Sequence, residues 1–216
     1  MVVYPKLVAS AYATIRVLRD VFNCRLPIEI WYRPNEMAQS SAMLDVLKGV
    51  GNDSVGGITL EEITHPRARR FNDKIYAVQH SKFDQILFLD ADNVLARDPS
   101  YLFEIPEFVQ TGAVFWPDYW HPDHTIFHVN KASLVWELLD TPFVDMFEQE
   151  SGQLLIDRRR HAAALDLVTF YGLHEPNYFD RLKLVWGDKD LFRLAWLKLG
   201  ASFHMIETPP ATAGRM

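Results

Sequence analysis

One run of residues limits the folds open to this chain more than any other. Residues 86–89 are four apolar residues, and they stop abruptly at Asp90-Ala91-Asp92. A short apolar run is typical of a strand buried in a sheet, and the sudden change to carboxylates marks its carboxyl end. In open α/β sheets, ligands bind outside the carboxyl ends of the strands. We therefore expect residues 90–92 to border a ligand site.

The segments around this strand alternate between helix and strand. The apolar spacing predicts helices at 7–22, 36–49, 68–82, 131–139, 158–172 and 188–199. It predicts strands at 27–32, 57–60, 85–89, 113–116, 125–129 and 201–206. This alternation, with short connections, predicts an α/β fold with a mostly parallel central sheet and helices on both faces.

The chain reads as a single domain followed by a short tail. Its 216 residues are 49% hydrophobic, which suits one compact core. We expect the domain at 1–206 and a flexible tail at 207–216, where turn-forming residues dominate. A nucleotide-binding sheet normally opens with a strand that touches the ligand. Because only Val2-Val3-Tyr4 precede Pro5 and the first helix, we expect the domain to lack its first strand.

Charge and composition exclude several classes of protein. The net charge is −6 and there is no long basic run, so a nucleic-acid partner is not expected. Cys24 is the only cysteine, so no intrachain disulfide can form. No stretch approaches the roughly 20 apolar residues of a membrane span. A membrane would be reached only through an anchor missing from this chain.

The acidic pair predicts a metal site. On an extended backbone, Asp90 and Asp92 lean to the same side, where they repel each other unless they share a cation. Carboxylate oxygens suit Mn²⁺ or Mg²⁺. His204, near the last predicted strand, has the chemistry for a third ligand, although a lone histidine is more often structural. A turn that uses aspartate for capping is the alternative for the pair.

Further polar residues are candidates for contacts with phosphate or sugar. Lys74 could reach back to a phosphate as a point charge, or be an exposed lysine. Glu150 and Gln153 could orient a sugar hydroxyl beside Gly152, which lets a ligand approach the backbone, or they could cap an element. Asp188 could bind a hydroxyl or serve only as a helix N-cap.

An aromatic segment follows the predicted strand at 113–116. Trp116 could offer its face to a sugar, and Asp118 could accept hydrogen bonds from sugar hydroxyls. The alternative for Trp116 is a place in the core. We interpret residues 116–121 as one wall of a binding site.

Five stretches together resemble one known family. They are SAYATIRVLRDVFNCRLPIEIWY, FNDKIYAVQHSKFDQILFLDADNVLARDPSYLFE, GAVFWPDYW, ESGQLLIDRRRH and WGDKDLFRLAW. In this order they are similar to the fungal-type α-mannosyltransferases of the Golgi, glycosyltransferase family 71, which have the GT-A nucleotide-sugar fold. The acidic pair alone would be a weak motif, whereas the five stretches are specific.

The resemblance implies a function and a set of site residues. It implies metal-dependent, retaining transfer of a sugar, mannose above all, to a hydroxyl of a glycan or glycoprotein. Asp90-Ala91-Asp92 would hold Mn²⁺ on the diphosphate of GDP-mannose, or less favourably of a UDP-sugar. Lys74 would lie near the nucleotide, and Glu150, Gln153 and Asp188 would border the sugar and the acceptor. The full-length form would be a type II membrane protein of the Golgi lumen.

Two alternatives remain open from the residues. In a haloacid-dehalogenase-type phosphohydrolase, Asp90 would be the nucleophile and Asp92 the general acid. Against this, that motif normally starts its domain, whereas three predicted helices precede Asp90. In the second alternative, the domain is not an enzyme, and it binds glycan or supports a partner transferase.

Overall fold

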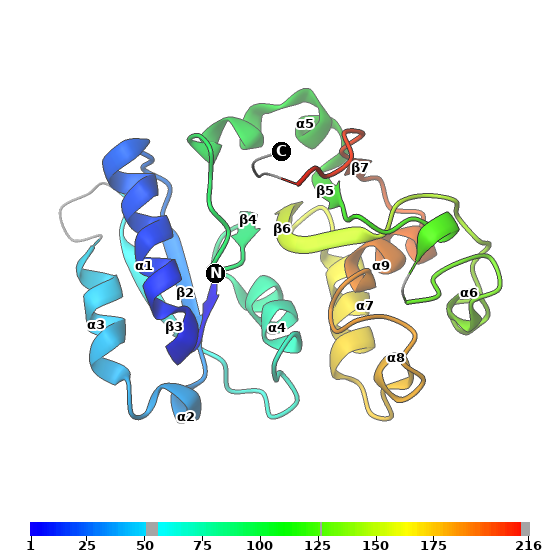
Figure 1. Cartoon of the computed structure of the whole chain (residues 1–216), viewed down its shortest axis with the longest axis horizontal. Coiled ribbons are helices and arrows are strands. Elements are labelled where there is room, and N and C mark those ends of the chain that lie inside the picture. Colours follow the sequence, from blue (N-terminus) through cyan, green and yellow to red (C-terminus); the bar gives the residue numbers. More distant parts are fainter. Residues whose placement is uncertain (51–55, 126, 213–216) are drawn as a thin grey trace.

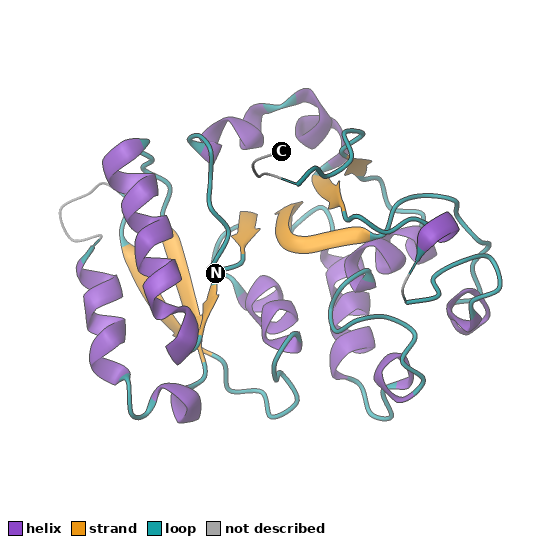
Figure 2. Cartoon of the chain, viewed as in Figure 1, coloured by secondary structure: helices purple, strands orange, loops and turns teal. Residues whose placement is uncertain are grey.

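The computed structural model describes residues 1–50, 56–125 and 127–212. Its strands there are β1 (Val2–Val3), β2 (Ile28–Tyr32), β3 (Ile58–Glu62), β4 (Gln85–Leu89), β5 (Ala113–Pro117), β6 (Gln149–Asp157) and β7 (His204–Met205). Its α-helices are α1 (Val8–Arg16), α2 (Pro34–Met37), α3 (Ser41–Gly49), α4 (Asn72–His80), α5 (Pro106–Thr111), α6 (Leu134–Leu138), α7 (Ala162–Leu173), α8 (Tyr178–Arg181) and α9 (Leu191–Leu199). Helices and strands mix along the chain (Figure 2), so the predicted α/β class is confirmed.

The described strands form two sheets. The first has the order β1-β2-β3 and is parallel throughout. The second has the order β4-β6-β5-β7, in which β6 runs antiparallel to β4 and to β5, while β7 is parallel to β5. Three of the five strand pairings are therefore parallel, in agreement with the predicted mostly parallel arrangement.

Helices cover both faces of the first sheet (Figure 1). On one face, Ile15 of α1 and Leu47 of α3 pack with Ile30 of β2 in one apolar cluster. On the other face, Ala77 of α4 packs with Trp31 of β2. A strand that is covered on both faces has a nearly continuous run of apolar residues. The strands of this sheet could therefore be predicted from the sequence.

The second sheet is also covered on both faces. The largest core lies on one face, where residues of α4, α7 and α9 pack on β4, β5 and β6; Phe192 and Trp196 of α9 are fully buried there. On the other face, Phe108 of α5 packs with Val114 and Leu155. Helix α4 contributes Ile75 and Val78 to the core of the second sheet and Ala77 to that of the first, so it lies where the two sheets approach each other.

The predicted strand at 125–129 is wrong. Residues 125 and 127–129 form neither helix nor strand, and Ile126 lies outside the described residues. The reason is local: the Thr125 hydroxyl accepts hydrogen bonds from the backbone N–H groups of Phe127 at 3.2 Å and Val129 at 3.3 Å. A side chain that satisfies the backbone in this way competes with a strand ladder.

Several predicted elements exist but are shorter than expected. The helix expected at 188–199 begins only at Leu191, because Asp190 adopts a left-handed conformation with φ of 68°. The helix expected at 131–139 is confined to α6, and the last strand to β7. Helix α1 passes into a π-helical turn at Val17–Val21.

The two ends of the chain have little regular structure in the described residues. Val2 and Val3 form a short strand in register with Trp31 and Tyr32 of β2. Residues 207–212 form neither helix nor strand, and 213–216 lie outside the described residues. The domain limits and the missing first strand stay predictions. No helix in the described part of the chain is long and apolar enough to cross a membrane.

Candidate active site

The chain turns immediately after β4, and this turn carries the acidic pair. Ala91 and Asp92 form a turn in which the Asn93 N–H donates to the carbonyl of Asp90 at 3.0 Å. The extended backbone assumed for the pair is therefore wrong. The Asn93 amide also donates to the carbonyl of Gly152 at 2.7 Å, which fixes the turn to β6. Asp92 is exposed, and Asp90 is half-buried.

A buried lysine joins the acidic turn to two other segments. The Lys74 ammonium lies 3.3 Å from a carboxylate oxygen of Asp90 and 3.3 Å from one of Asp188. It also donates to the carbonyl of Ser151 at 2.7 Å and to its hydroxyl at 3.1 Å. We call these four residues the Lys74 cluster. Because its ammonium already has four partners, Lys74 is neither an exposed lysine nor a free point charge for phosphate.

The charges in the Lys74 cluster depend on one another. Burial raises the pKa of Asp188, and the ammonium of Lys74 opposes that rise, while the nearby carboxylate of Asp90 adds to it. Burial works against the charged form of Lys74, but Asp188 and Asp90 outweigh it and raise the pKa of Lys74. A buried charge is stable only when it is paired, so Asp188 and Lys74 maintain each other's ionisation.

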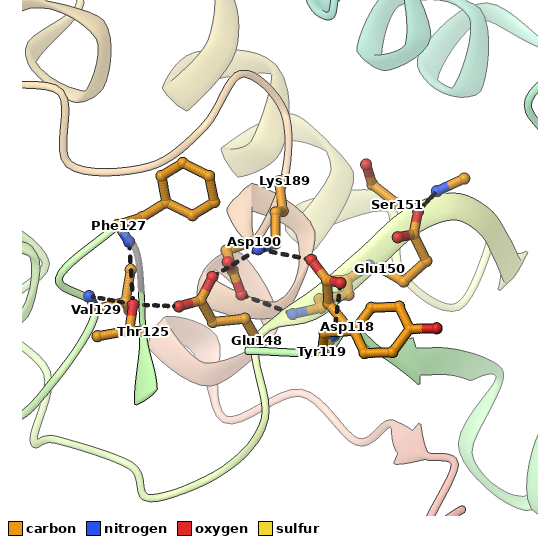
Figure 3. Close-up of polar contacts among 12 residues, drawn as sticks. Asp118, Tyr119, Thr125, Phe127, Val129, Glu148, Glu150, Ser151, Lys189 and Asp190 are labelled. Atoms are coloured by element: carbon orange, nitrogen blue, oxygen red, sulfur yellow. Dashed lines mark hydrogen bonds and ion pairs between the residues drawn. The ribbon is translucent and has the colours of Figure 1, made fainter. Parts of the chain in front are cut away.

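A second lysine, adjacent in sequence to Asp188, holds two further carboxylates (Figure 3). The Lys189 ammonium lies 2.7 Å from Asp118 and 2.6 Å from Glu148. The other carboxylate oxygen of Glu148 accepts a hydrogen bond from the Thr125 hydroxyl at 2.6 Å. We call these four residues the Lys189 cluster. Burial opposes the charge of Lys189, but hydrogen bonds to Asp118 and Glu148 outweigh it and raise its pKa.

Asp190 anchors the loop that carries Asp188 and Lys189. Its carboxylate accepts from the backbone N–H of Gln149 at 2.9 Å and pairs with the Arg193 guanidinium at 2.7 Å. Both charged side chains are almost fully buried. These contacts fix the loop to β6 and α9, so Asp190 has a structural role.

Glu150 lies between the two clusters. Burial raises the pKa of its carboxyl, and the backbone N–H of Gly152 opposes the rise; the charges of Asp118 and Asp90 raise it, and that of Lys74 lowers it. A side chain on Gly152 would collide with Glu150, since its Cβ would lie 2.9 Å from a Glu150 carboxylate oxygen. The sequence predicted that a ligand approaches the backbone at Gly152. The groups close to Gly152 in the structure are the side chains of Glu150 and Asn93.

The combined site is strongly negative. It has six carboxylates against two lysines, a formal charge of −4 when all are ionised. The carboxylates are those of Asp90, Asp92, Asp118, Glu148, Glu150 and Asp188, and the lysines are Lys74 and Lys189. A diphosphate would be repelled here unless it arrived with a cation.

The residues present suit a cation that is shared with a ligand. In the described residues no group of three or more His, Cys, Asp and Glu side chains is placed to hold a metal ion. Mg²⁺ and similar ions are commonly bound by one or two carboxylates together with substrate phosphates. Asp90 and the exposed Asp92 fit that arrangement, with the phosphates and water as the remaining ligands.

The structure does not bring His204 to this site. His204 lies on β7, in register with Val114 of β5, and β7 and β4 are the two opposite edges of the second sheet. Three strand spacings, about 14 Å in all, therefore separate it from the β4 edge, where Asp90 lies. A shared ion with Asp90 and Asp92 is geometrically excluded for this residue.

The remaining predicted residues occupy three different settings. Ala91 is fully buried in the core of the first sheet, so only its backbone is available to a ligand. Trp116 is half-buried against the core around Phe108, in register with Glu150. Gln153, on β6, pairs with Leu89 of β4 and is half-buried.

An exposed aromatic group borders the Lys189 cluster. Trp186 is 59% exposed and stacks on Phe127, with ring centroids 5.4 Å apart; Phe71 lies 6.4 Å from Trp186. The Lys189 ammonium lies over the ring of Phe127 at 4.7 Å. Gly187, with φ of 62°, allows this packing, because a Cβ there would lie 2.5 Å from Phe71. We call Phe71, Phe127 and Trp186 the aromatic platform.

Sequence reasoning missed Lys189, Glu148 and the aromatic platform. A signal for Lys189 was present, because a lysine between Asp188 and Asp190 has carboxylates on both sides. Glu148 and Phe127 gave no signal, since their partners are distant in the sequence.

Comparison with known proteins places the chain in a family. A family described as mannosyltransferase matches residues 1–216. The chain belongs to this mannosyltransferase family. Among curated relatives, it is 25% identical to the alpha-1,2-mannosyltransferase MNN2 of Saccharomyces cerevisiae, over 97% of this chain and 41% of that protein. It is 26% identical to the alpha-1,2-mannosyltransferase MNN21 of Candida albicans, over 89% of this chain and 36% of that protein.

The chain therefore spans about two fifths of the length of these relatives. A solved structure shares its fold: the crystal structure of the glycosyltransferase GlyE of Streptococcus pneumoniae TIGR4 has a TM-score of 0.57 at 12% identity. The match covers 95% of this chain and 44% of that one. The predicted family and the glycosyltransferase type of fold are confirmed.

Proposed function

We propose that this chain carries the catalytic site of an α-mannosyltransferase that moves mannose from GDP-mannose to a hydroxyl of a glycan or glycoprotein. The family match over residues 1–216 is the observation that carries the proposal. The negative site at the end of β4 agrees with it, since a nucleotide diphosphate would need Mn²⁺ or Mg²⁺ to bind there. The same family relationship leads us to propose the Golgi lumen as the location of the full-length protein.

The proposed roles follow from exposure and pairing. Asp90 and Asp92 would hold the cation, which when bound neutralises charge that builds on the departing diphosphate. Lys74 would position Asp90, because its ammonium contacts that carboxylate. Asp188 and Glu150 would accept hydrogen bonds from hydroxyls of the sugar. A buried carboxylate that gains such a donor stabilises a fixed orientation of the sugar.

The proposed transfer proceeds with retention at the anomeric carbon. The acceptor oxygen forms its bond to this carbon from the face that the diphosphate oxygen leaves. The acceptor proton passes to an oxygen of the departing diphosphate. The transition state is oxocarbenium-like, as in other glycosyl chemistry. No side chain is required as a nucleophile in this scheme. The chain's carboxylates would orient the sugar and hold the cation that stabilises the departing diphosphate.

The first test concerns the acidic turn. Asp92 is exposed, and within the described residues it makes no hydrogen bond or ion pair, so Asp92→Asn is expected to leave the fold intact while weakening GDP binding in the presence of Mn²⁺ at least about tenfold. Titration calorimetry with GDP and UDP, each with and without Mn²⁺, measures this effect and also compares the two nucleotides. Unchanged affinity in Asp92→Asn would remove the metal role.

The same titration tests one alternative function, and a trapping experiment tests the other. A domain that only binds glycan or supports a partner predicts no nucleotide binding with or without Mn²⁺. A phosphohydrolase that uses Asp90 as nucleophile predicts a trapped adduct with beryllium fluoride, which the transferase does not form. The family match favours the transferase over both.

A second test concerns the aromatic platform, which we propose as a contact for the acceptor sugar. One face of Trp186 stacks on Phe127, while the residue remains largely exposed. Because stacking on an aromatic ring contributes about 1 kcal/mol, Trp186→Ala is expected to raise KM for a mannose oligosaccharide about fivefold to tenfold. KM for GDP-mannose should change little.

The control for this test is Tyr178→Ala, which removes an aromatic side chain of similar exposure from α8. Steady-state kinetics with each substrate varied in turn give both KM values. A rise in donor KM alone, with acceptor KM unchanged, would contradict the acceptor role of Trp186.

A further inference from the structure

One polar side chain is buried in the apolar face of α1. Thr14 is 5% exposed and lies between Ala11 and Ile15, which belong to the core of the first sheet. Burying a hydroxyl is costly unless it forms a hydrogen bond. In the described residues, the hydroxyl of Thr14 donates to the backbone carbonyl of Asn93, in the turn after β4, at 3.2 Å. Thr14 therefore joins α1 to the turn that carries the acidic pair.

This contact differs from the usual one of a threonine in a helix. Such a hydroxyl commonly bonds to a carbonyl three or four residues earlier in the same helix. Thr169 in α7 does so, since its hydroxyl donates to the carbonyl of Leu165 at 2.9 Å. The partner of Thr14 is 79 residues away in the sequence. A valine would fill the same space without needing a partner, so the packing of α1 does not by itself account for a hydroxyl here.

The acidic turn is fixed at three points. The side chain of Ala91 is fully buried in the core of the first sheet. The carbonyl of Gly152 in β6 accepts from the backbone N–H of Asp90 at 2.8 Å and from the side-chain amide of Asn93 at 2.7 Å. The Thr14 hydroxyl holds the carbonyl of the same asparagine. The turn is thus attached to the core of the first sheet, to β6 and to α1.

Asp92 depends on these attachments more than Asp90 does. The Lys74 ammonium contacts the carboxylate of Asp90 at 3.3 Å, whereas Asp92 is exposed and, within the described residues, makes no hydrogen bond or ion pair. The direction of the Asp92 side chain is therefore set by the backbone of the turn, and Asn93 is the next residue along it. A ligand that is held in place binds a cation more tightly, because less freedom is lost on binding.

We propose that Thr14 is a positioning residue for the cation site: its hydroxyl holds the carbonyl of Asn93 and so fixes the direction of the Asp92 carboxylate. This role rests on the proposed function, in which Asp90 and Asp92 hold the cation that accompanies the diphosphate. Thr14 itself would touch neither the cation nor the donor. The proposal gives α1, which packs on the first sheet, a part in donor binding.

The test compares three substitutions of Thr14. Thr14→Val keeps the shape and removes the hydroxyl, Thr14→Ala removes both hydroxyl and methyl, and Thr14→Ser keeps the hydroxyl alone. We expect Thr14→Val and Thr14→Ala to weaken Mn²⁺-dependent GDP binding about threefold to tenfold, as for the loss of one hydrogen bond, and Thr14→Ser to stay within about twofold of the unsubstituted protein. GDP binding without Mn²⁺ should be alike in all four proteins. Titration calorimetry gives these affinities.

A second measurement needs neither metal nor nucleotide. The backbone N–H of Asn93 donates to the carbonyl of Asp90 at 3.0 Å, so its hydrogen exchange reports the order of the turn. We expect this exchange to be at least about threefold faster in Thr14→Val and Thr14→Ala, and unchanged in Thr14→Ser. Thr169→Val is the matched control, because it removes a hydroxyl that bonds within its own helix. Tm shows that the variants are folded, and it should fall by no more than about 4 °C in Thr14→Val.

Three outcomes overturn the proposal. The first is that Thr14→Val and Thr14→Ser bind GDP with Mn²⁺ equally well. The second is that exchange at Asn93 is no faster in Thr14→Val than in Thr169→Val. The third is an equal loss of GDP binding with and without Mn²⁺, because Thr14 would then support the fold and not the cation site. If the unsubstituted protein does not bind GDP with Mn²⁺, the proposed function fails, whereas faster exchange at Asn93 would still show that the hydroxyl orders the turn.

Discussion

Asp188→Asn is expected to lower kcat/KM for mannosyl transfer by about 100-fold to 1,000-fold. The substitution keeps the shape of the side chain and removes its charge. Among the described residues, Asp90 would then be the one charged partner left to Lys74, and the ammonium would shift toward it and neutralise the carboxylate proposed to hold the cation. The sugar would also lose a charged hydrogen-bond acceptor.

The measurement is the rate of transfer from GDP-mannose to a mannose oligosaccharide with Mn²⁺, at saturating and at limiting donor. Asp45→Asn on α3 is the matched control, because Asp45 is exposed. Circular dichroism and Tm establish that both variants are folded. If Asp188→Asn retains a rate within about threefold of the control, the buried carboxylate has no part in transfer.

The regions that the sequence predicts well are those where local and global signals agree. The strand at 85–89 and its polar end could be predicted because a strand buried on both faces has an uninterrupted run of apolar residues. The helices that cover the first sheet could also be predicted. Each has buried apolar residues at helical spacing, such as Ile15 in α1 and Leu47 in α3. The structure places Asp90 and Asp188 on Lys74 and Asp118 on the neighbouring Lys189, while the roles proposed for these residues stay predictions.

The predictions that failed depend on contacts distant in sequence. Lys74 was ambiguous because its partners, Ser151 and Asp188, are 77 and 114 residues away along the chain. Strand β6 was not among the predicted strands, because polar residues make up its first half, Gln149–Gln153. Its antiparallel direction also has no local signal, because a buried central strand has the same apolar pattern in either direction. The position of His204 on the far edge follows from strand order, which a linear sequence does not display.

The Lys189→Met variant is expected to lose about 3 to 5 kcal/mol of the free energy of unfolding. Its ammonium is the charged partner of both Asp118 and Glu148, whose side chains are 14% and 1% exposed. Methionine fills similar volume but leaves two buried carboxylates close together without a cation. For a domain of this size, the loss corresponds to a Tm lower by about 10 °C.

A double variant distinguishes lost charge from lost packing. Adding Glu148→Gln to Lys189→Met removes the more deeply buried of the two carboxylates, so the double variant should recover part of the lost stability. Lys198→Met is the matched control, because Lys198 pairs with the fully exposed Asp140 and surface pairs contribute little. Urea unfolding of the four proteins gives the free energies. A double variant less stable than Lys189→Met would show that the ammonium acts through packing, and the Lys189 cluster would then have no electrostatic role in holding the loop at 186–190 against β6.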